Sequence, residues 1–375
     1  MTKTESKSKL NAENSSVYCV IMAGGIGSRF WPMSTAQKPK QFLDVLGIGK
    51  TLIQMTYERL ILTSPKENIY VVTNESYFSL VKEQLPHLSD SQILTEPERK
   101  NTAPCVAYAA AKIYAMDENA KLVIAPADHL ILKEEKFTET VKIALKKAEL
   151  DRLVTIGIKP TRPDTGYGYI QFSEDGDIMA GDVKPVKHFT EKPDKEVAEL
   201  FLKSGNYYWN AGIFVWKASV ILDALKKFSP DLHQLFAKDL SFYNTENEQK
   251  RINQIFRSCE DISIDYAVME KTKIADVVLA SFDWSDLGTW GSLYTHLEKD
   301  YNGNAVIGEH VYMINSTNCI VNLPNHKLAL IEGLDNHIVI ESENMLMILN
   351  KNDEQNLKKY VVPMQENSPM FFGKE

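Results

Sequence analysis

The stretch Val17–Phe42 reads VYCVIMAGGIGSRFWPMSTAQKPKQF and joins a short apolar run directly to a glycine-rich loop. The run Val17–Met22 has the length of a buried strand. The glycines that follow permit left-handed backbone and close approach of main-chain amides to a ligand; they are Gly24, Gly25 and Gly27. Arg29 and Lys40 then supply positive charge suited to phosphate oxygens. These residues predict a strand followed by a glycine loop that binds the phosphates of a nucleoside triphosphate. The alternative interpretation is a tight turn whose basic side chains are only solvated.

Two common glycine motifs do not fit this loop. A dinucleotide-binding fold would need a third glycine where this chain has Phe30, and the GK[ST] ending of a Walker loop is absent. The loop therefore indicates phosphate binding without identifying the kind of nucleotide protein.

Length, charge and cysteine usage narrow the class of protein. A chain of 375 residues predicts about two domains, and no apolar run approaches the roughly 18 residues of a membrane span. Residues 1–16 are polar and predict a disordered leader rather than a signal peptide. The net charge of −8 offers no general attraction to nucleic acid or anionic membranes. Four scattered cysteines predict reduced thiols in a cytoplasmic protein.

Outward from the first strand, apolar runs alternate with helical patterns. Further strands are expected at Ile69–Thr73, Gln92–Thr95 and Leu122–Ala125. Helices are expected between them at residues 52–62, 77–85 and 101–116, and later at 195–203, 218–228 and within 231–256. Strands that alternate with helices imply right-handed crossovers and a mostly parallel sheet. The prediction is an α/β fold with a Rossmann-like, doubly wound beginning.

The pattern of apolar and polar residues changes near Tyr301. Short apolar runs then recur about every nine or ten residues between Asn, Asp and Gly, which indicates a small all-β region, either a sandwich or a few coils of β-helix. A short helix is expected at residues 353–361, with Asp353 as its cap. The predicted organisation is a leader at 1–16, a first domain at 17–300 and a β-helix-like domain at 301–375.

Two separated carboxylates are candidates for holding a metal ion. Asp128 follows the apolar run of LVIAPADHLI, and the carboxyl ends of parallel strands are where ligands collect. Asp286 lies in SFDWSDLGTWGSLY. Mg²⁺ commonly takes one or two carboxylates and completes its shell with water and phosphate oxygens. Helix capping is the alternative for both aspartates, and a packing or hydrogen-bonding role is the alternative for His129.

Polar residues in the middle of the chain suit a sugar phosphate. Glu191 is a pure acceptor and Asn210 both donates and accepts, as sugar hydroxyls require. Lys192 is suited to a phosphate group, and Gly168 permits backbone approach to a sugar ring. The aromatic run at 207–209 either lines a pocket or belongs to the core.

The loop TEPERKNTAP stands between a predicted strand and an alanine-rich helix. Its Glu96, Arg99, Asn101 and Thr102 offer groups that can read a base. Capping of the helix by Asn101 or Thr102 explains the same residues equally well.

Taken together, these motifs resemble those of the bacterial mannose-1-phosphate guanylyltransferases in their short form. The similarity runs in order from Val17 to Tyr294 through MAGGIGSRFWPMS, PKQF, EPERKNTAP, PADH, TGYGYI, FTEKP, WNAGIFVW, SIDYAVMEK and DWSDLGTW. In SIDYAVMEK, Ser263 and Asp265 could equally cap a helix, so neither is assigned to the site.

The resemblance implies roles for matching positions. The triphosphate would be held by Gly24, Gly25, Gly27, Ser28, Arg29 and Lys40. The segment facing guanine and ribose would contain Glu96, Arg99, Asn101 and Thr102. Mg²⁺ would be bound by Asp128 and Asp286. Mannose 1-phosphate would be engaged by Gly168, Glu191, Lys192 and Asn210. Arg29, Lys40 and the two aspartates would form the catalytic set.

The implied reaction converts GTP and mannose 1-phosphate to GDP-mannose and pyrophosphate with Mg²⁺ as cofactor. The expected partners are these substrates, with no nucleic acid and no membrane, and a homodimer is left open. The isomerase domain of longer relatives, and its activity, are not expected. Two alternatives remain: a sister enzyme that uses another sugar or nucleotide, such as glucose 1-phosphate with dTTP or UTP, and a regulatory paralogue without catalysis.

Overall fold

The computed structural model describes residues 16–173 and 178–371, and the chain divides into two compact units. The first unit comprises the chain up to Gly24 with residues 56–127 and 131–284; the second comprises residues 25–55, 128–130 and 285–375. Of the predicted leader, residues 1–15 lie outside the described residues. The predicted domain boundary near Tyr301 stays a prediction.

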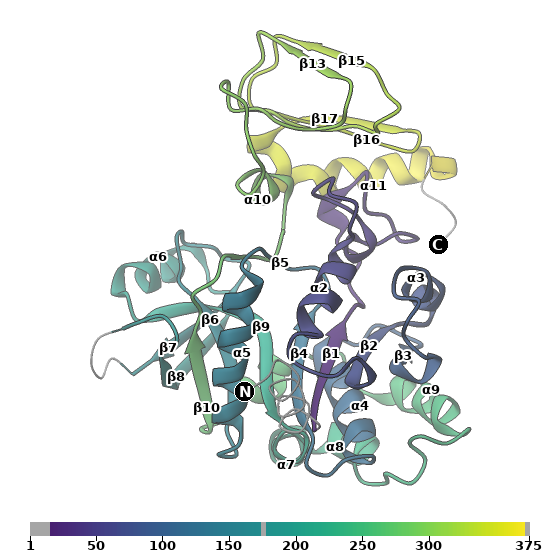
Figure 1. The fold of residues 1–375 in the computed structure, drawn as a ribbon, viewed down its shortest axis with the longest axis vertical. Helices are drawn as coiled ribbons and strands as arrows, with labels where there is room; N and C mark the ends of the chain where they lie inside the picture. The colour runs from purple at the N-terminus through teal and green to yellow at the C-terminus, as the bar shows by residue number, and fades with distance from the viewer. Residues whose placement is uncertain (1–15, 174–177, 372–375) are drawn as a thin grey trace, which may run out of the picture. The chain divides into compact units, whose positions relative to one another are not determined.

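Within the described residues, the first unit is built on a sheet of nine strands in the order β3-β2-β1-β4-β9-β6-β10-β8-β7 (Figure 1). The half formed by β3, β2, β1 and β4 is parallel, whereas β9 runs antiparallel to both β4 and β6. The strands are β1 Val17–Met22, β2 Ile69–Asn74, β3 Ile93–Glu96, β4 Lys121–Pro126, β6 Leu153–Ile158, β7 Gly168–Phe172, β8 Val183–Glu191, β9 Tyr207–Lys217 and β10 Ala275–Leu279. The parallel half confirms the predicted α/β beginning.

Helices connect these strands, as the alternating pattern predicts. They are α2 Leu52–Leu60, α3 Phe78–Gln84, α4 Thr102–Tyr114, α5 Glu134–Ala148, α6 Lys195–Ser204, α7 Ala218–Phe228, α8 Pro230–Phe236 and α9 Glu248–Ser258. Short turns of helix add η3 Lys66–Asn68, η4 Glu75–Tyr77, η5 Asp90–Gln92 and the π-helical η6 Asp265–Met269. Helix α5, which was not predicted, lies in front of β6, β9 and β10 in the view of Figure 1.

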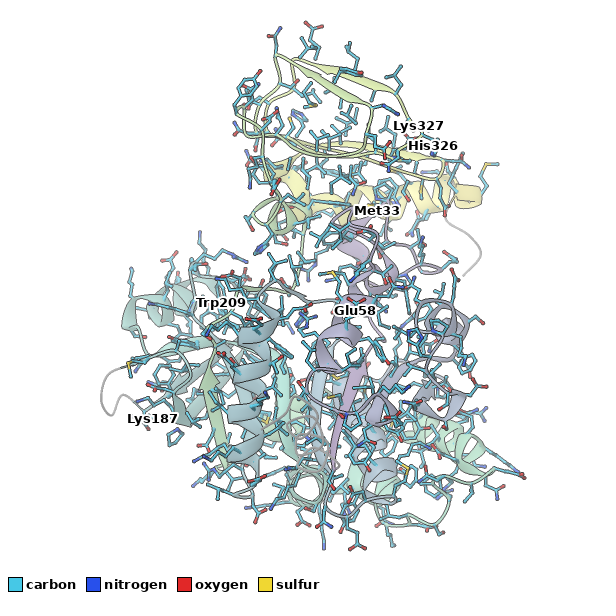
Figure 2. All side chains as sticks on the ribbon, viewed as in Figure 1. Met33, Glu58, Lys187, Trp209, His326 and Lys327 are labelled. Atoms are coloured by element: carbon cyan, nitrogen blue, oxygen red, sulfur yellow. The ribbon has the colours of Figure 1, made fainter. Side chains whose placement is uncertain are left out.

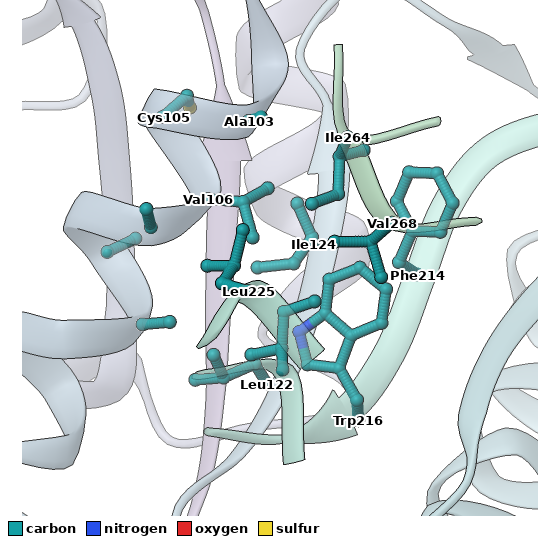
Figure 3. Close-up of a cluster of buried hydrophobic side chains, with 14 of the residues drawn as sticks. Ala103, Cys105, Val106, Leu122, Ile124, Phe214, Trp216, Leu225, Ile264 and Val268 are labelled. Carbon is teal, nitrogen blue, oxygen red and sulfur yellow. The ribbon is translucent and has the colours of Figure 1, made fainter. Parts of the chain in front are cut away.

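The main hydrophobic core of the first unit joins the sheet to α4 and α7. Alternate residues of β4, Leu122 and Ile124, point to this core because side chains alternate across a strand. They meet Val106 of α4, Leu225 of α7 and Trp216 of β9 (Figure 3). The core therefore holds the parallel strands β1 to β4 in place. Candidate residues such as Gly24 and Glu96 lie at the carboxyl ends of these strands.

The predicted helix within residues 231–256 is interrupted. Helices α8 and α9 are separated by a segment in which Asn244 adopts φ 60° and Tyr243 is buried. The Tyr243 hydroxyl donates to the carbonyl of Phe236 at 2.7 Å. Glu248 accepts hydrogen bonds from Tyr108 at 2.8 Å and Lys112 at 2.6 Å. These buried polar contacts stabilise the segment between α8 and α9 in a non-helical conformation.

The second unit carries the glycine corner and the C-terminal strands. Its elements are η1 Ser28–Phe30, η2 Lys40–Phe42, α10 Trp290–Tyr294, β12 Ala305–Ile307, β13 Val311–Ile314, β14 Ile320–Asn322, β15 Ala329–Glu332, β16 His337–Ser342, β17 Met345–Asn350, η7 Lys351–Asn356, α11 Leu357–Asn367 and η8 Pro369–Phe371. Strands β5 Leu130–Ile131 and β11 Trp284–Ser285 lie where the chain passes between units. A core of Phe30, Trp290, Ile320 and Ile338 joins the corner to the C-terminal strands within this unit.

The C-terminal strands form coils of a β-helix rather than a sandwich. Strand β14 pairs in parallel with both β12 and β16, and β13 pairs in parallel with β15. Strand β17 then returns antiparallel to β16. The expected cap of the final helix is wrong: α11 begins after Asn356, and Asp353 instead accepts hydrogen bonds from Asn356 at 2.7 Å and Tyr360 at 2.6 Å.

No helix among residues 16–173 and 178–371 combines the length and hydrophobicity needed to cross a bilayer.

Candidate active site

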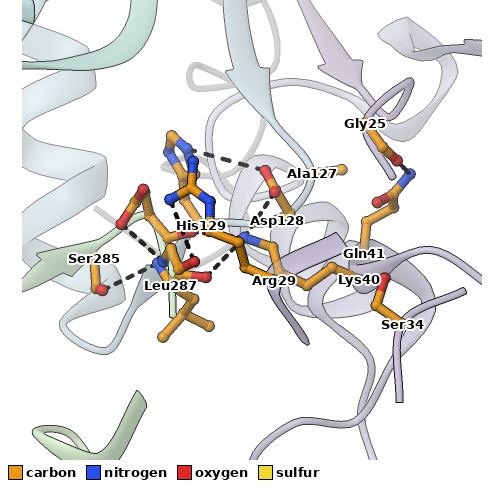
Figure 4. Close-up of polar contacts among 12 residues, drawn as sticks. Gly25, Arg29, Ser34, Lys40, Gln41, Ala127, Asp128, His129, Ser285 and Leu287 are labelled. Carbon is orange, nitrogen blue, oxygen red and sulfur yellow. Dashed lines mark hydrogen bonds and ion pairs between the residues drawn. The ribbon is translucent and has the colours of Figure 1, made fainter. Parts of the chain in front are cut away.

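The ammonium group of Lys40 is the centre of a polar cluster in the second unit (Figure 4). Its Nζ lies 2.8 Å from Oδ2 of Asp128. It also donates to the main-chain carbonyls of Asp286 at 2.6 Å and Leu287 at 3.2 Å. Only 3% of Lys40 is exposed. A buried ammonium needs such oxygen partners, and together they place Asp128 and the chain at Asp286 around a single charge.

One glycine of the corner is required by its conformation and its surroundings. Gly27 adopts φ 68° and ψ 38°, which a side chain disfavours, and an added Cβ would lie 2.4 Å from Cβ of Lys40. The main-chain N–H of Lys40 donates to the carbonyl of Ile26 at 3.3 Å, while Gln41 donates to the carbonyl of Gly25 at 2.9 Å. The glycine loop and the lysine segment therefore form one structure.

Gly24 and Gly25 do not adopt left-handed backbone. A Cβ at Gly25 would meet nothing within 4 Å among the described residues, and one at Gly24 would lie 3.8 Å from Oε2 of Glu96. The space beside Gly25 is therefore open with respect to the described residues. Ser28 begins the short helix η1 and is exposed.

Arg29 lies beside the segment that follows Asp286. Its Nη1 donates to the carbonyl of Gly288 at 3.4 Å, and the side chain is otherwise exposed. The carboxylate of Asp286 accepts the main-chain N–H of Gly288 at 3.0 Å. The helix that follows, α10, is capped by Thr289 and not by Asp286, so the capping alternative for this aspartate is wrong.

Asp128 also does not cap a helix, because α5 begins at Glu134 after Lys133. Its side chain is half-buried, and His129 Nε2 lies 4.0 Å from its Oδ1. Burial would raise the pKa of Asp128, but the nearby charges of Lys40 and His129, with hydrogen bonding from Lys40, hold the pKa below its usual value. This carboxyl therefore remains ionised at neutral pH.

The donor chemistry of this cluster fits a hard divalent cation. Asp128 and Asp286 supply carboxylate oxygens, the ligands that Mg²⁺ prefers. Within the part of the chain that the structure describes, no group of three or more acidic, His or Cys side chains is arranged as a metal site. Two carboxylates nevertheless suffice for Mg²⁺, since water and substrate phosphates complete its shell.

A second polar group belongs to the first unit, at the ends of β1 and β3. The Arg99 side chain donates to the carbonyl of Gly24 at 3.2 Å and forms a short hydrogen bond with the hydroxyl of Tyr77. Glu96 is 5% exposed, and its Oε1 has no hydrogen-bond partner among the described residues. Burial raises the pKa of Glu96 to about 8, against smaller opposing effects of Cys105 and Arg99.

Asn101 and Thr102 have local structural roles. Asn101 caps α4: its Oδ1 accepts the N–H of Thr102 at 3.0 Å, and its own backbone has φ 64°. The hydroxyl of Thr102 accepts the N–H of Ile264 at 2.9 Å. The capping alternative thus describes Asn101, and a nucleotide-binding role for these residues stays a prediction.

A third group, also in the first unit, contains the residues predicted for the sugar phosphate. Lys192 Nζ lies 2.7 Å from Oε1 of Glu191, whose side chain is 9% exposed. A Cβ at Gly168 would lie 2.4 Å from Oε2 of the same carboxylate. The observed position of the Glu191 side chain therefore requires glycine at residue 168. Burial would lower the pKa of Lys192, but its hydrogen bond and charge interaction with Glu191 raise the pKa overall.

Asp265 belongs to this third group although the sequence left it unassigned. Its Oδ1 accepts a hydrogen bond from Nδ2 of Asn210 at 3.0 Å. It does not act as a cap for η6, whereas Ser263 accepts the N–H of Tyr266 at 3.3 Å. Loss of water around Asp265 and the nearby Glu191 raise its pKa to about 7. The only sequence signal was the position of Asp265 within SIDYAVMEK.

The aromatic run at 207–209 packs against other aromatic side chains. Tyr207 stacks on Phe201 at 3.9 Å between ring centroids, and Trp209 packs edge-on against Tyr167 at 5.0 Å. Trp209 lies on β9 within the first unit (Figure 2). Only 3% of its surface is exposed.

Comparisons with known proteins identify the family of the chain. The chain matches the nucleotidyl transferase family over residues 18–303. It is 40% identical over 350 residues to the alginate biosynthesis protein AlgA of Pseudomonas syringae pv. tomato, covering 92% of this chain and 71% of that protein. It is 38% identical over 351 residues to the mannose-1-phosphate guanylyltransferase of Escherichia coli, covering 93% and 74%.

A solved structure supports the same assignment. The crystal structure described as mannose-1-phosphate geranyltransferase from Thermus thermophilus has a TM-score of 0.82 and 28% sequence identity. The similarity covers 93% of this chain and 99% of that chain. The chain therefore belongs to the nucleotidyl transferase family and, within it, to the bacterial mannose-1-phosphate guanylyltransferases.

Proposed function

We propose that the protein transfers the guanylyl group of GTP to mannose 1-phosphate, forming GDP-mannose and pyrophosphate. The observation that carries this proposal is the cluster around Lys40, where a buried ammonium, an ionised Asp128 and the chain at Asp286 come together. Such a cluster suits a reaction that handles polyphosphate. The similarity to proteins named mannose-1-phosphate guanylyltransferase supports mannose 1-phosphate and GTP as the proposed substrates.

The reaction needs no covalent bond to the enzyme. A phosphate oxygen of mannose 1-phosphate attacks the α-phosphorus of GTP, and the bond to the departing pyrophosphate breaks in line. The amides of Gly25 and Gly27 and the side chain of Ser28 hold triphosphate oxygens in this proposal, together with the neighbouring Gly24. Arg29 and Lys40 offset the charge that develops on pyrophosphate, which is worth most where water is excluded.

Guanine and ribose are assigned to the segment that contains Glu96, Arg99, Asn101 and Thr102. The sugar phosphate is assigned to Glu191, Lys192, Asn210 and Gly168. The ionised Glu191 carboxylate can only accept hydrogen bonds, so a sugar hydroxyl must donate to it. Lys192 holds the attacking phosphate and gives up part of its pairing with Glu191 when it does so.

Asp128 and Asp286 would hold Mg²⁺, which neutralises phosphate charge and aligns phosphate oxygens when bound. Asp128 keeps its charge without the ion, since Lys40 lies beside it. A cytoplasmic location is also part of the proposal, because all four cysteines are free and buried. Whether the enzyme works as a homodimer is left to a measurement of its mass in solution.

A substrate matrix tests the proposal. Purified protein is incubated with Mg²⁺, each of GTP, ATP, UTP and dTTP, and mannose 1-phosphate or glucose 1-phosphate, and pyrophosphate release is measured. We expect the highest kcat/KM for GTP with mannose 1-phosphate. A Lys217→Met variant, which loses an exposed ion pair with Asp151 at 2.7 Å, serves as the matched control for handling and folding.

The alternatives give different results in the same matrix. Product from UTP or dTTP with glucose 1-phosphate, and none from GTP, would identify a sister enzyme and overturn the named substrates. A folded protein that binds nucleotide but releases no pyrophosphate in any combination would point to a regulatory paralogue.

A further inference from the structure

Asp265 is a half-buried carboxyl group to which the proposed reaction assigns no role. It begins η6, and its side chain contacts Asn210, which lies on β9. Sequence places these residues far apart, so the contact exists only because of the fold. The question is what Asp265 does to Asn210.

The orientation of the Asn210 amide follows from its neighbours. The main-chain N–H of Gly212 donates to one atom of this amide at 3.2 Å. A main-chain N–H can only donate, so that atom is the oxygen, Oδ1. The hydroxyl of Thr155 donates to the same oxygen at 2.9 Å. The amide nitrogen therefore faces Asp265, which is an acceptor.

This arrangement limits what Asn210 can offer to a ligand. Gly212 and Thr155 occupy both lone pairs of its oxygen, and Asp265 takes one of its two N–H groups. The other N–H group makes no hydrogen bond to the residues that the structure describes. Asn210 is half-buried, so part of the residue is exposed to solvent. The residue thus acts as a single donor rather than as the mixed donor and acceptor that its chemistry allows.

We propose that Asp265 is a positioning residue that fixes Asn210 so that its remaining N–H group is presented to an oxygen of the sugar phosphate. The inference rests on the proposed function, since it assumes that Asn210 meets the sugar phosphate. Without Asp265, the amide nitrogen of Asn210 loses its hydrogen-bond acceptor, while Gly212 and Thr155 still bind the amide oxygen. The amide can then rotate, so its N–H groups are no longer held in one direction.

The charges around Asp265 indicate which replacement should work. Glu191 lies near enough to raise the pKa of Asp265, while Lys192 opposes this effect. A neutral side chain with an acceptor oxygen therefore suits this position. Asparagine keeps an acceptor oxygen for Asn210, whereas alanine does not.

The test compares Asp265→Ala with Asp265→Asn, with KM measured separately for mannose 1-phosphate and GTP. For Asp265→Ala we expect KM for mannose 1-phosphate to rise about 10- to 100-fold, as for loss of a hydrogen bond to a charged group, with KM for GTP within about twofold of wild type. Asp265→Asn should return KM for mannose 1-phosphate to within about threefold of wild type. Thr155→Val, which removes the opposite contact of Asn210, should raise the same KM by about 3- to 10-fold.

Several results would overturn the inference. They are an unchanged KM in Asp265→Ala, an equal rise in both variants, and parallel changes in both KM values. A thermal melt of each variant separates loss of fold from loss of positioning, and the rescue by asparagine would not occur if the role were charge alone. Wild-type turnover with GTP and mannose 1-phosphate tests the proposed function independently of these variants.

Discussion

Two half-buried aspartates in the molecule have opposite electrostatic behaviour. Asp128 in the second unit has a lowered pKa although burial acts to raise it, because Lys40 lies 2.8 Å away. Asp265 in the first unit has its pKa raised to about 7, because loss of water and Glu191 together outweigh Lys192 and Asn210. Burial acts to raise the pKa of both carboxyls; the charge of Lys40 outweighs that effect at Asp128, whereas the charge of Glu191 adds to it at Asp265.

The difference matches the two kinds of ligand that we propose. Phosphates and divalent ions need charges that stay fixed, and the Lys40 cluster is built from ionised groups and main-chain carbonyls. Sugar hydroxyls need hydrogen bonds of defined direction. In the group around Asn210, hydrogen bonds to Thr155, Gly212 and Asp265 fix the orientation of the side-chain amide. Variants of Lys40, Arg29 and Gly168 should break this contrast with progressively smaller losses of activity.

Removal of the Lys40 ammonium should have the largest effect. Lys40→Met leaves Asp128 without its nearest cation and leaves two carbonyl groups without their donor. We expect kcat to fall by more than about 10³-fold, beyond the usual loss of one charge stabiliser, and the melting temperature to fall by several degrees. Lys217→Met is the control, and similar kcat values for the two variants would contradict the central role of Lys40.

Removal of the Arg29 charge should affect catalysis but hardly stability. The side chain is exposed, and its Nη1 donates to the carbonyl of Gly288 at 3.4 Å. For Arg29→Ala we expect kcat to fall about 10²- to 10³-fold with an unchanged melting temperature. Arg251→Ala, at an exposed arginine of α9, is the matched control. Near-normal turnover of Arg29→Ala at saturating GTP would exclude the proposed role.

A methyl group added at Gly168 should disturb the sugar group alone. The new Cβ would lie 2.4 Å from Oε2 of Glu191, so the carboxylate must move. For Gly168→Ala we expect KM for mannose 1-phosphate to rise about tenfold, a loss comparable to one hydrogen bond, while KM for GTP stays unchanged. Equal changes in both KM values would remove the distinction between the two groups of residues.

The buried carboxyl of Glu96 should affect the pH dependence of stability. Its pKa of about 8 in the folded state exceeds the ordinary value of 4.5 in the unfolded chain. The unfolded state therefore gains more from ionisation between these values, and stability falls as pH rises from about 4.5 to 8, by at most about 1.4 kcal/mol per pH unit. Glu96→Gln should show a smaller fall in melting temperature between about pH 5 and pH 8 than wild type. Identical pH profiles would contradict the raised pKa.

Much of the fold could be predicted because it depends on local patterns. Strand β1 and helix α7 have the predicted bounds, Val17–Met22 and Ala218–Phe228. Helix α5 was not predicted, although its sequence alternates buried apolar residues with charged ones. The interruption between α8 and α9 could not be predicted, since it depends on Glu248 meeting Tyr108 and Lys112 from a distant helix.

The candidate site shows the same limit. Motifs indicated Lys40, Asp128 and Asp286 as chemically suitable, but their mutual contacts depend on distant chain segments being brought together by the fold. Asp265 was passed over because an aspartate ahead of a helical segment has an ordinary explanation as a cap. Only the fold shows that its side chain is directed to Asn210.

The reversal of direction at β17 sets a limit on the length of the C-terminal coils. Parallel pairing links Ala305 to Ile320 and Ile320 to Ile338, so each coil offers a template for the next. Strand β17 pairs antiparallel along β16 and occupies the edge where another parallel coil would be added. Engineering a longer solenoid would therefore require insertion ahead of β16, because extension beyond β17 would meet a strand of the wrong polarity.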